Sequence, residues 1–93
     1  MGEKIRAHVV ITGKVQGVFF RMETKRTADM YGVYGWVQNK SNGTVEAVFE
    51  GDKEQVGSIV DWCKKGPPFA NVRRVDVKWE KHTGELNAFN ITH

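Results

Sequence analysis

Residues 33–50, VYGWVQNKSNGTVEAVFE, contain two runs rich in β-branched and aromatic residues, at 33–39 and 44–50. Such runs favour strands, and Asn42-Gly43 between them can supply the positive φ angles that a tight hairpin needs. The sequence therefore predicts that the two runs pair as an antiparallel hairpin. In the second run the side chains predicted to face inward are Val45, Ala47 and Phe49, and those predicted to face the other way are Glu46 and Glu50.

Helices are predicted on both sides of this hairpin. On the N-terminal side, an apolar stripe at helical spacing begins at Phe20, and Gly32 should end the helix. On the C-terminal side, Asp52 and Gln55 resemble a capping box, and Gly66 with the two prolines after it should end the second helix. The stripe positions are Phe20, Thr24, Ala28 and Tyr31 in the first helix and Val56, Ile59, Val60 and Cys63 in the second.

Three further strands are predicted from period-two alternation. Their apolar positions are Ile5, Ala7, Val9 and Ile11 before the first helix, Val75, Val77 and Trp79 after the second, and Phe89 and Ile91 near the C-terminus. The order β-α-β-β-α-β with a terminal strand predicts one α+β domain over residues 1–93. The fold class expected is a ferredoxin-like α/β sandwich (βαββαβ), in which an antiparallel sheet carries two helices on one face.

The composition limits the class of function. Fourteen Lys and Arg against eleven Asp and Glu give a net charge of +3, which favours anionic ligands without forming the basic run that indicates nucleic acid. Cys63 is the only cysteine, so neither an intramolecular disulfide nor a zinc-type cluster is expected. No window approaches the ~18 apolar residues of a membrane span, and no signal-type cleavage site is visible. We therefore expect a cytoplasmic protein with no membrane partner.

The segment GKVQGVFFR, at residues 13–21, lies between the first strand and the first helix. Gly13 and Gly17 allow a turn whose backbone N–H groups converge on one anion, and the helix N-terminus adds about half a positive charge. Arg21 can place its planar guanidinium on the same anion. Two glycines four residues apart also occur where they only shape a loop, so the residues alone leave both interpretations open. The segment lacks the GxxxxGK[ST] and GxGxxG patterns, so no nucleotide cofactor is expected.

Three segments together resemble the acylphosphatase family along the chain: GKVQGVFFR, GWVQNKSNGTVE (35–46) and KKGPPFANV (64–72). The resemblance implies hydrolysis of the carboxyl–phosphate anhydride bond of acyl phosphates. It implies that the amides of the first loop and Arg21 hold the phosphoryl group, and that Asn39 orients the attacking water. The phosphate-binding residues that it implies are Val15, Gln16, Gly17, Val18, Phe19, Phe20 and Arg21.

The resemblance also implies that no metal or cofactor takes part, that inorganic phosphate inhibits as a product, and that the chain acts as a monomer. A carboxylate is a good leaving group, so positioning and charge stabilisation can suffice. No strong base stands among the matched residues, and one hypothesis is that the proton of the water passes to the bound phosphate. Gln38 stands where the family often has a basic residue, a departure that would weaken the attraction of larger anionic substrates.

Two other functions stand as alternatives, an RNA-binding sandwich and a non-catalytic anion-binding module. The basic pI and the aromatic content suggest the first, but Glu46 and Glu50 on the outward face would repel RNA phosphates. The histidines His8, His82 and His93 have no metal-ligand spacing and are expected at the surface. Cys63 and the tryptophans Trp36, Trp62 and Trp79 are expected to be packing residues.

Overall fold

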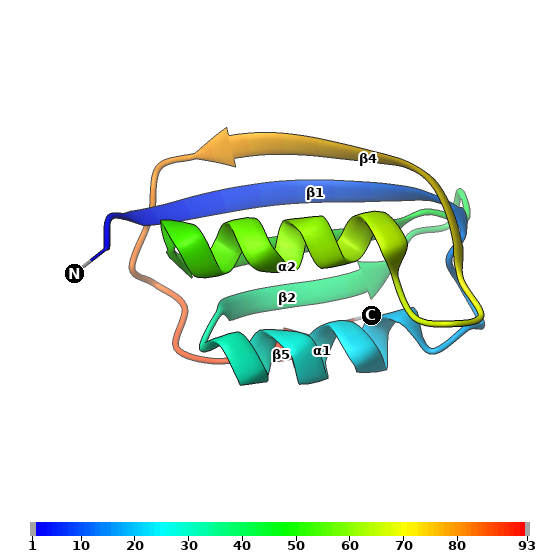
Figure 1. Ribbon diagram of the computed structural model, residues 1–93, viewed down its shortest axis with the longest axis horizontal. Helices are drawn as coiled ribbons and strands as arrows, with labels where there is room; N and C mark the ends of the chain where they lie inside the picture. Colours follow the sequence, from blue (N-terminus) through cyan, green and yellow to red (C-terminus); the bar gives the residue numbers. More distant parts are fainter. Residues whose placement is uncertain (1, 93) are drawn as a thin grey trace.

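The computed structural model describes residues 2–92, which form five strands and two helices (Figure 1). In chain order these are β1 (Lys4–Lys14), α1 (Phe20–Tyr31), β2 (Tyr34–Asn39), β3 (Val45–Asp52), α2 (Lys53–Lys65), β4 (Asn71–Glu80) and β5 (Phe89–Ile91). Both helices lie on the same face of the sheet, as predicted (Figure 1). Neither of these helices is long and apolar enough to cross a membrane.

The strands form one sheet in the order β4-β1-β3-β2-β5. β1 pairs antiparallel with β3 and β4, and β2 pairs antiparallel with β3, but β5 runs parallel to β2. The prediction of a wholly antiparallel sheet is therefore wrong at this edge. β4 ends at the same end of the sheet at which β2 begins, and residues 81–88 cross along that end to the far edge, so β5 runs in the same direction as β2 (Figure 1). The ferredoxin-like sandwich itself is confirmed.

The core lies between the sheet and the two helices. Ten of the residues predicted to face inward from β1, β3 and α2 are at most 3% exposed. They are Ala7, Val9, Ile11, Val45, Ala47, Phe49, Val56, Ile59, Val60 and Cys63. Burial also raises the pKa of the Cys63 thiol, which agrees with the predicted role of Cys63 as a packing residue. In α1, Thr27 is buried with the predicted stripe, whereas Tyr31 is 37% exposed. Tyr31 is the last helical residue, where Gly32 turns the chain with a φ of +70°.

Two local predictions are wrong. Asp52 precedes α2 but makes no capping hydrogen bond; its Oδ1 accepts a hydrogen bond from Lys4 Nζ at 2.9 Å, because the two residues are opposite each other in the β1–β3 register. In the β2–β3 loop only Gly43 has a positive φ, of +90°, and Asn42 does not. The Oδ1 of Asn42 instead accepts hydrogen bonds from the backbone N–H and hydroxyl of Thr44. The loop is closed by this side-chain acceptor together with two backbone hydrogen bonds, from Gly43 N–H to the oxygen of Lys40 at 3.1 Å and from Lys40 N–H to the oxygen of Thr44 at 2.9 Å.

A buried ionic cluster lies on the sheet face away from the helices. Glu50 in β3 faces that side, as predicted, but is only 1% exposed. Its carboxylate accepts hydrogen bonds from Arg6 Nη1 at 2.7 Å and Thr83 Oγ1 at 2.7 Å, and one from the backbone N–H of Gly84 at 3.3 Å. Thr83 and Gly84 belong to the segment 81–88, so the cluster fastens the β4–β5 connection to the sheet.

Candidate active site

The loop between β1 and α1, residues 15–19, is held by buried side chains. The anchoring residues are Val15, Val18 and Phe20, at 1%, 5% and 2% exposure. Between these anchors, Gly17 and Phe19 have positive φ angles of +74° and +68° and are exposed. Left-handed residues alternating with buried anchors bend the backbone into a tight turn directly ahead of α1.

The backbone N–H groups of residues 16–20 are free donors. Within residues 2–92, none of them gives a hydrogen bond to a backbone or side-chain acceptor. They precede the first turn of α1, whose own unpaired amides and dipole add partial positive charge. A run of free donors at a helix N-terminus is an arrangement that binds phosphate and similar anions.

Gln16 fixes this loop to the neighbouring β2–β3 hairpin. Its side-chain Nε2 donates hydrogen bonds to the backbone oxygen of Lys40 at 2.7 Å and to that of Thr44 at 2.9 Å. Asn39, the last residue of β2, immediately precedes Lys40. The side chain of Gln16 therefore sets the separation between the loop amides and Asn39.

The structure brings Arg21 and Asn39 to one pocket of about 360 Å³. Its lining residues are Val15, Gly17, Phe19, Phe20, Arg21, Met22, Asn39 and Ile91. Of the predicted phosphate-binding residues, Gln16 and Val18 do not line it, although their amides belong to the same loop. Sequence reasoning missed Met22 and Ile91. The adjacency of Met22 to Arg21 was the only available signal for the former, and no pattern revealed that the strand containing Ile91 lies beside β2.

The two polar side chains of the pocket form no side-chain hydrogen bond or ion pair within residues 2–92. Arg21, in the first turn of α1, is half-buried and makes no ion pair or side-chain hydrogen bond with any other residue of the described chain. The Oδ1 of Asn39 is buried and has no hydrogen-bond partner in residues 2–92. Burying an unsatisfied acceptor costs about 1–3 kcal/mol. Both groups are thus available to a ligand or a water molecule.

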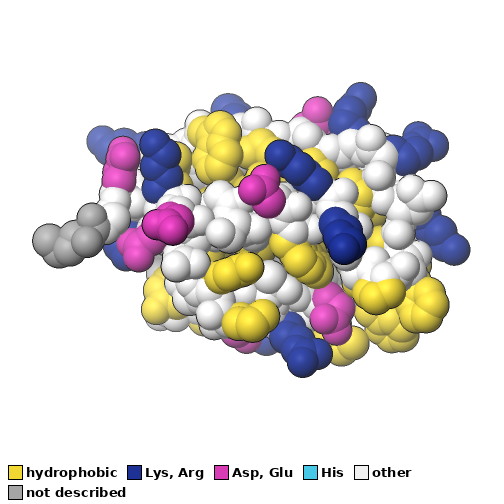
Figure 2. Space-filling model, in the orientation of Figure 1, with side chains coloured by type: hydrophobic (Ala, Val, Ile, Leu, Met, Phe, Trp, Pro, Cys, Tyr) yellow, Lys and Arg dark blue, Asp and Glu magenta, His cyan; other side chains and the backbone are white. Residues whose placement is uncertain are grey.

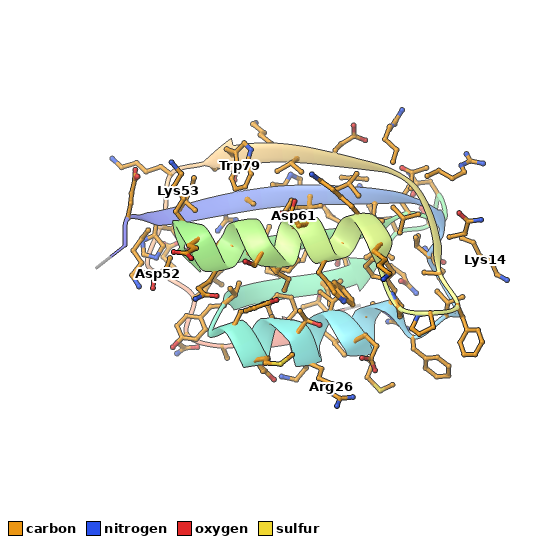
Figure 3. The ribbon with its side chains drawn as sticks, in the orientation of Figure 1. Lys14, Arg26, Asp52, Lys53, Asp61 and Trp79 are labelled. Carbon is orange, nitrogen blue, oxygen red and sulfur yellow. The ribbon has the colours of Figure 1, made fainter. Side chains whose placement is uncertain are left out.

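The charge around the pocket favours anions. Arg21 is the one charged residue of its lining, which contains no carboxylate and no imidazole among the described residues. Lys14 projects from the same end of the sheet as the loop, whereas Asp52 and Lys53 lie at the opposite end (Figure 3). Cations on one side of a pocket without opposing carboxylates raise the local concentration of anionic ligands.

The two histidines of the described residues, His8 and His82, do not line this pocket. His8 Nε2 is 2.6 Å from Glu46 Oε2, and His82 Nε2 is 3.5 Å from Glu50 Oε1. His93 lies outside the described residues. Residues 2–92 contain no group of three or more His, Cys, Asp or Glu that could hold a metal ion.

Fold and site together define a small α/β-sandwich protein in which the first strand-to-helix loop presents free backbone amides beside an arginine and an asparagine. The model of the acylphosphatase family matches residues 7–91. The chain belongs to the acylphosphatase family, as its sequence motifs predict.

Individual relatives agree with this assignment. The acylphosphatase of Pelotomaculum thermopropionicum is 54% identical over 88 residues, which cover 95% of this chain and 96% of that protein. The crystal structure of acylphosphatase from Bacillus subtilis is 31% identical with a TM-score of 0.92, covering 96% of this chain and 99% of that one. The acylphosphatase structure from Coxiella burnetii is 34% identical with a TM-score of 0.90, covering 96% and 93%.

Proposed function

We infer that the protein is an enzyme that hydrolyses the carboxyl–phosphate anhydride bond of acyl phosphates to a carboxylate and inorganic phosphate. Membership of the acylphosphatase family and the names of its relatives support this activity. The observation that extends it to particular residues is the pocket in which an unpaired Arg21 and the unpartnered oxygen of Asn39 meet the loop.

We propose that the amides of residues 16–20 and the guanidinium of Arg21 hold the phosphoryl group. As the bond between phosphorus and the bridging oxygen breaks, charge redistributes over the phosphoryl oxygens. Donors already fixed around these oxygens stabilise that charge without reorganising, which is a large source of catalysis. Gln16 supports this role because its side chain fixes the loop to the hairpin carbonyls.

Asn39 orients the attacking water in this proposal. Its Oδ1 accepts a hydrogen bond from the water and turns an oxygen lone pair toward phosphorus, opposite the leaving carboxylate. The water oxygen then bonds to phosphorus while the bond from phosphorus to the bridging oxygen breaks, and that electron pair leaves with the carboxylate. Because the described lining offers no carboxylate or imidazole as a base, the proton of the water passes to a phosphoryl oxygen.

The proposed reaction uses no metal or other cofactor. Magnesium prefers carboxylate oxygens, and the described pocket lining supplies a guanidinium, an amide and backbone donors instead. Inorganic phosphate matches the same donors, so it should compete with substrate as a product inhibitor.

We further propose that the chain acts as a single-domain, cytoplasmic monomer without a nucleic-acid or membrane partner. A single buried cysteine fits a reducing compartment. The partly exposed carboxylate of Glu46, on the sheet face away from the helices, disfavours the RNA-binding alternative. The non-catalytic alternative differs in its outcome, because it predicts phosphate binding without turnover.

Hydrolysis of acetyl phosphate in the presence of EDTA tests the proposal. We expect turnover that the chelator leaves unchanged and that millimolar phosphate inhibits competitively. Activity that depends on added magnesium would contradict the metal-free mechanism. Phosphate binding with no turnover would identify the non-catalytic module.

A further inference from the structure

A second, apolar pocket of about 260 Å³ adjoins the phosphate pocket. We call it the acyl groove, and define it by Phe19, Met22, Pro67, Pro68 and Phe69, with Glu23 as the one charged residue of its lining. Phe19 and Met22 line both pockets, so they form a shared wall. Figure 2 shows apolar side chains gathered at the lower right end of the molecule, where Figure 1 places the β1–α1 loop and the α2–β4 turn.

Three large apolar side chains of the acyl groove are open to solvent. Phe69 is 70% exposed, Phe19 is 61% exposed and Met22 is 53% exposed. Neighbouring large apolar side chains left in water commonly mark a binding surface. Phe19 is also the one non-glycine residue of the described chain with a positive φ. A bulky residue is strained in that conformation, and here the strained backbone holds an exposed ring at the junction of the two pockets.

We propose that the acyl groove binds the hydrocarbon or aromatic part of an acyl phosphate whose phosphoryl group lies in the β1–α1 loop. The inference rests on the proposed function and names its substrate class. In an acyl phosphate one bridging oxygen separates the carbonyl carbon from phosphorus, so a longer acyl group has to leave the phosphate pocket past one of its walls. The wall formed by Phe19 and Met22 leads onto Phe69 and the two prolines.

The charge of the acyl groove indicates which acyl groups it should favour. The carboxylate of Glu23 is its only charged group, and it disfavours an acyl group that carries a second anion. The groove therefore selects neutral, apolar acyl groups over short ones, which do not reach it, and over anionic ones, which Glu23 repels.

A series of straight-chain substrates measures the groove directly. For the wild-type enzyme in a series from acetyl to hexanoyl phosphate, kcat/KM should rise about twofold for each methylene once the chain is long enough to reach the groove, against the about fourfold that complete burial of a methylene would give. Values of kcat/KM that do not change with chain length would overturn the proposal.

Phe69→Ala tests the groove without touching the phosphate pocket, which Phe69 does not line. The ratio of kcat/KM for benzoyl phosphate to that for acetyl phosphate should fall about tenfold, the usual scale for losing part of an apolar subsite. Met30→Ala is the matched control, since Met30 is 73% exposed near the opposite end of α1. It should keep the wild-type ratio.

The outcomes separate the two inferences. Turnover of acetyl phosphate by the wild type, with an unchanged substrate ratio in Phe69→Ala, would overturn the acyl groove and leave the proposed function standing. Absence of turnover of either substrate by the wild type would overturn the proposed function, and the groove with it. An equal fall of the ratio in Met30→Ala would show that the effect does not belong to the groove.

Discussion

Arg21 and Asn39 share one pocket but have different proposed tasks, so their variants should differ in kind. Asn39→Ala removes the group that orients the water and leaves the loop amides and Arg21 in place. Turnover of acetyl phosphate should fall by about two to three orders of magnitude, the usual cost of one preorganised hydrogen-bonding group. Inorganic phosphate should still raise the midpoint of thermal unfolding, because it binds only the native state.

Arg21→Ala is the comparison for this prediction, because it should lose both turnover and protection by phosphate. Melting curves with and without phosphate check that each variant is folded. The assignment of roles is wrong if folded Asn39→Ala loses phosphate protection as completely as Arg21→Ala does.

Arg21→Lys tests whether the shape of the cation matters as well as its charge. A lysine ammonium keeps the positive charge but cannot donate two parallel hydrogen bonds to two phosphoryl oxygens. We expect a lower affinity for inorganic phosphate, measured as an increased inhibition constant, together with a lower kcat. Kinetics close to those of the wild type would mean that Arg21 contributes charge alone.

Two glycines within regular elements, one in β2 and one in α2, should change the free energy of unfolding in opposite directions when replaced by alanine. Gly35 in β2 has a φ of +150°, and an added Cβ would lie 1.8 Å from the backbone oxygen of Val48 in β3. Gly35→Ala must separate the two strands, so we expect a loss of at least about 3 kcal/mol in the free energy of unfolding. Gly57, within α2, has no atom within 4 Å of that position. Gly57→Ala should stabilise by about 0.5–1 kcal/mol, as urea unfolding of both variants would show.

How far an element could be predicted depended on its length and on how regularly it is buried. The stripe of α2 repeats over three turns against one sheet face, so all of its buried positions were visible in the pattern. β5 contains three residues, too few to specify a neighbour or a direction. The motif resemblance singled out Arg21 and Asn39, which line one pocket, but the acyl groove joins Phe19 to Phe69, which are far apart in the chain. Their contact with one groove depends on how the β1–α1 loop and the α2–β4 turn meet in space.

The Glu50 cluster makes the stability of the whole molecule depend on pH. Burial raises the pKa of Glu50, but hydrogen bonds from Arg6, Thr83 and Gly84 outweigh this effect, and the pKa of Glu50 lies below its ordinary value. A group whose pKa is lower in the folded state stabilises that state above its unfolded pKa. This stability is lost as the pH falls through the folded-state pKa. The free energy of unfolding of the wild type should therefore decline on acidification below about pH 4.

Glu50→Gln should remove much of this pH dependence. It should lower the free energy of unfolding near neutral pH by about 2 kcal/mol, because the charge-assisted hydrogen bond from Arg6 is lost while Arg6 keeps its ion pair with Glu80. It should also flatten the decline in acid. The control is Glu85→Gln, which changes an exposed glutamate of the same β4–β5 connection and should leave both quantities near their wild-type values. An unchanged acid slope in Glu50→Gln, measured by urea unfolding from neutral pH to pH 3, would contradict the prediction.

The parallel strand β5 should also prevent self-association of the protein. It covers the outer edge of β2, with hydrogen bonds from the backbone N–H of Gly35 to Ala88 and from that of Thr92 to Val37. An uncovered β2 would offer unpaired N–H and C=O groups to a strand of another copy, a route to aggregation. A chain shortened before Ala88 should therefore self-associate, and light scattering that stays at the monomer value would contradict this. Because β2 ends at Asn39, such an aggregate would form beside the pocket that contains Arg21 and Asn39, so solubility and the proposed activity depend on the same short segment.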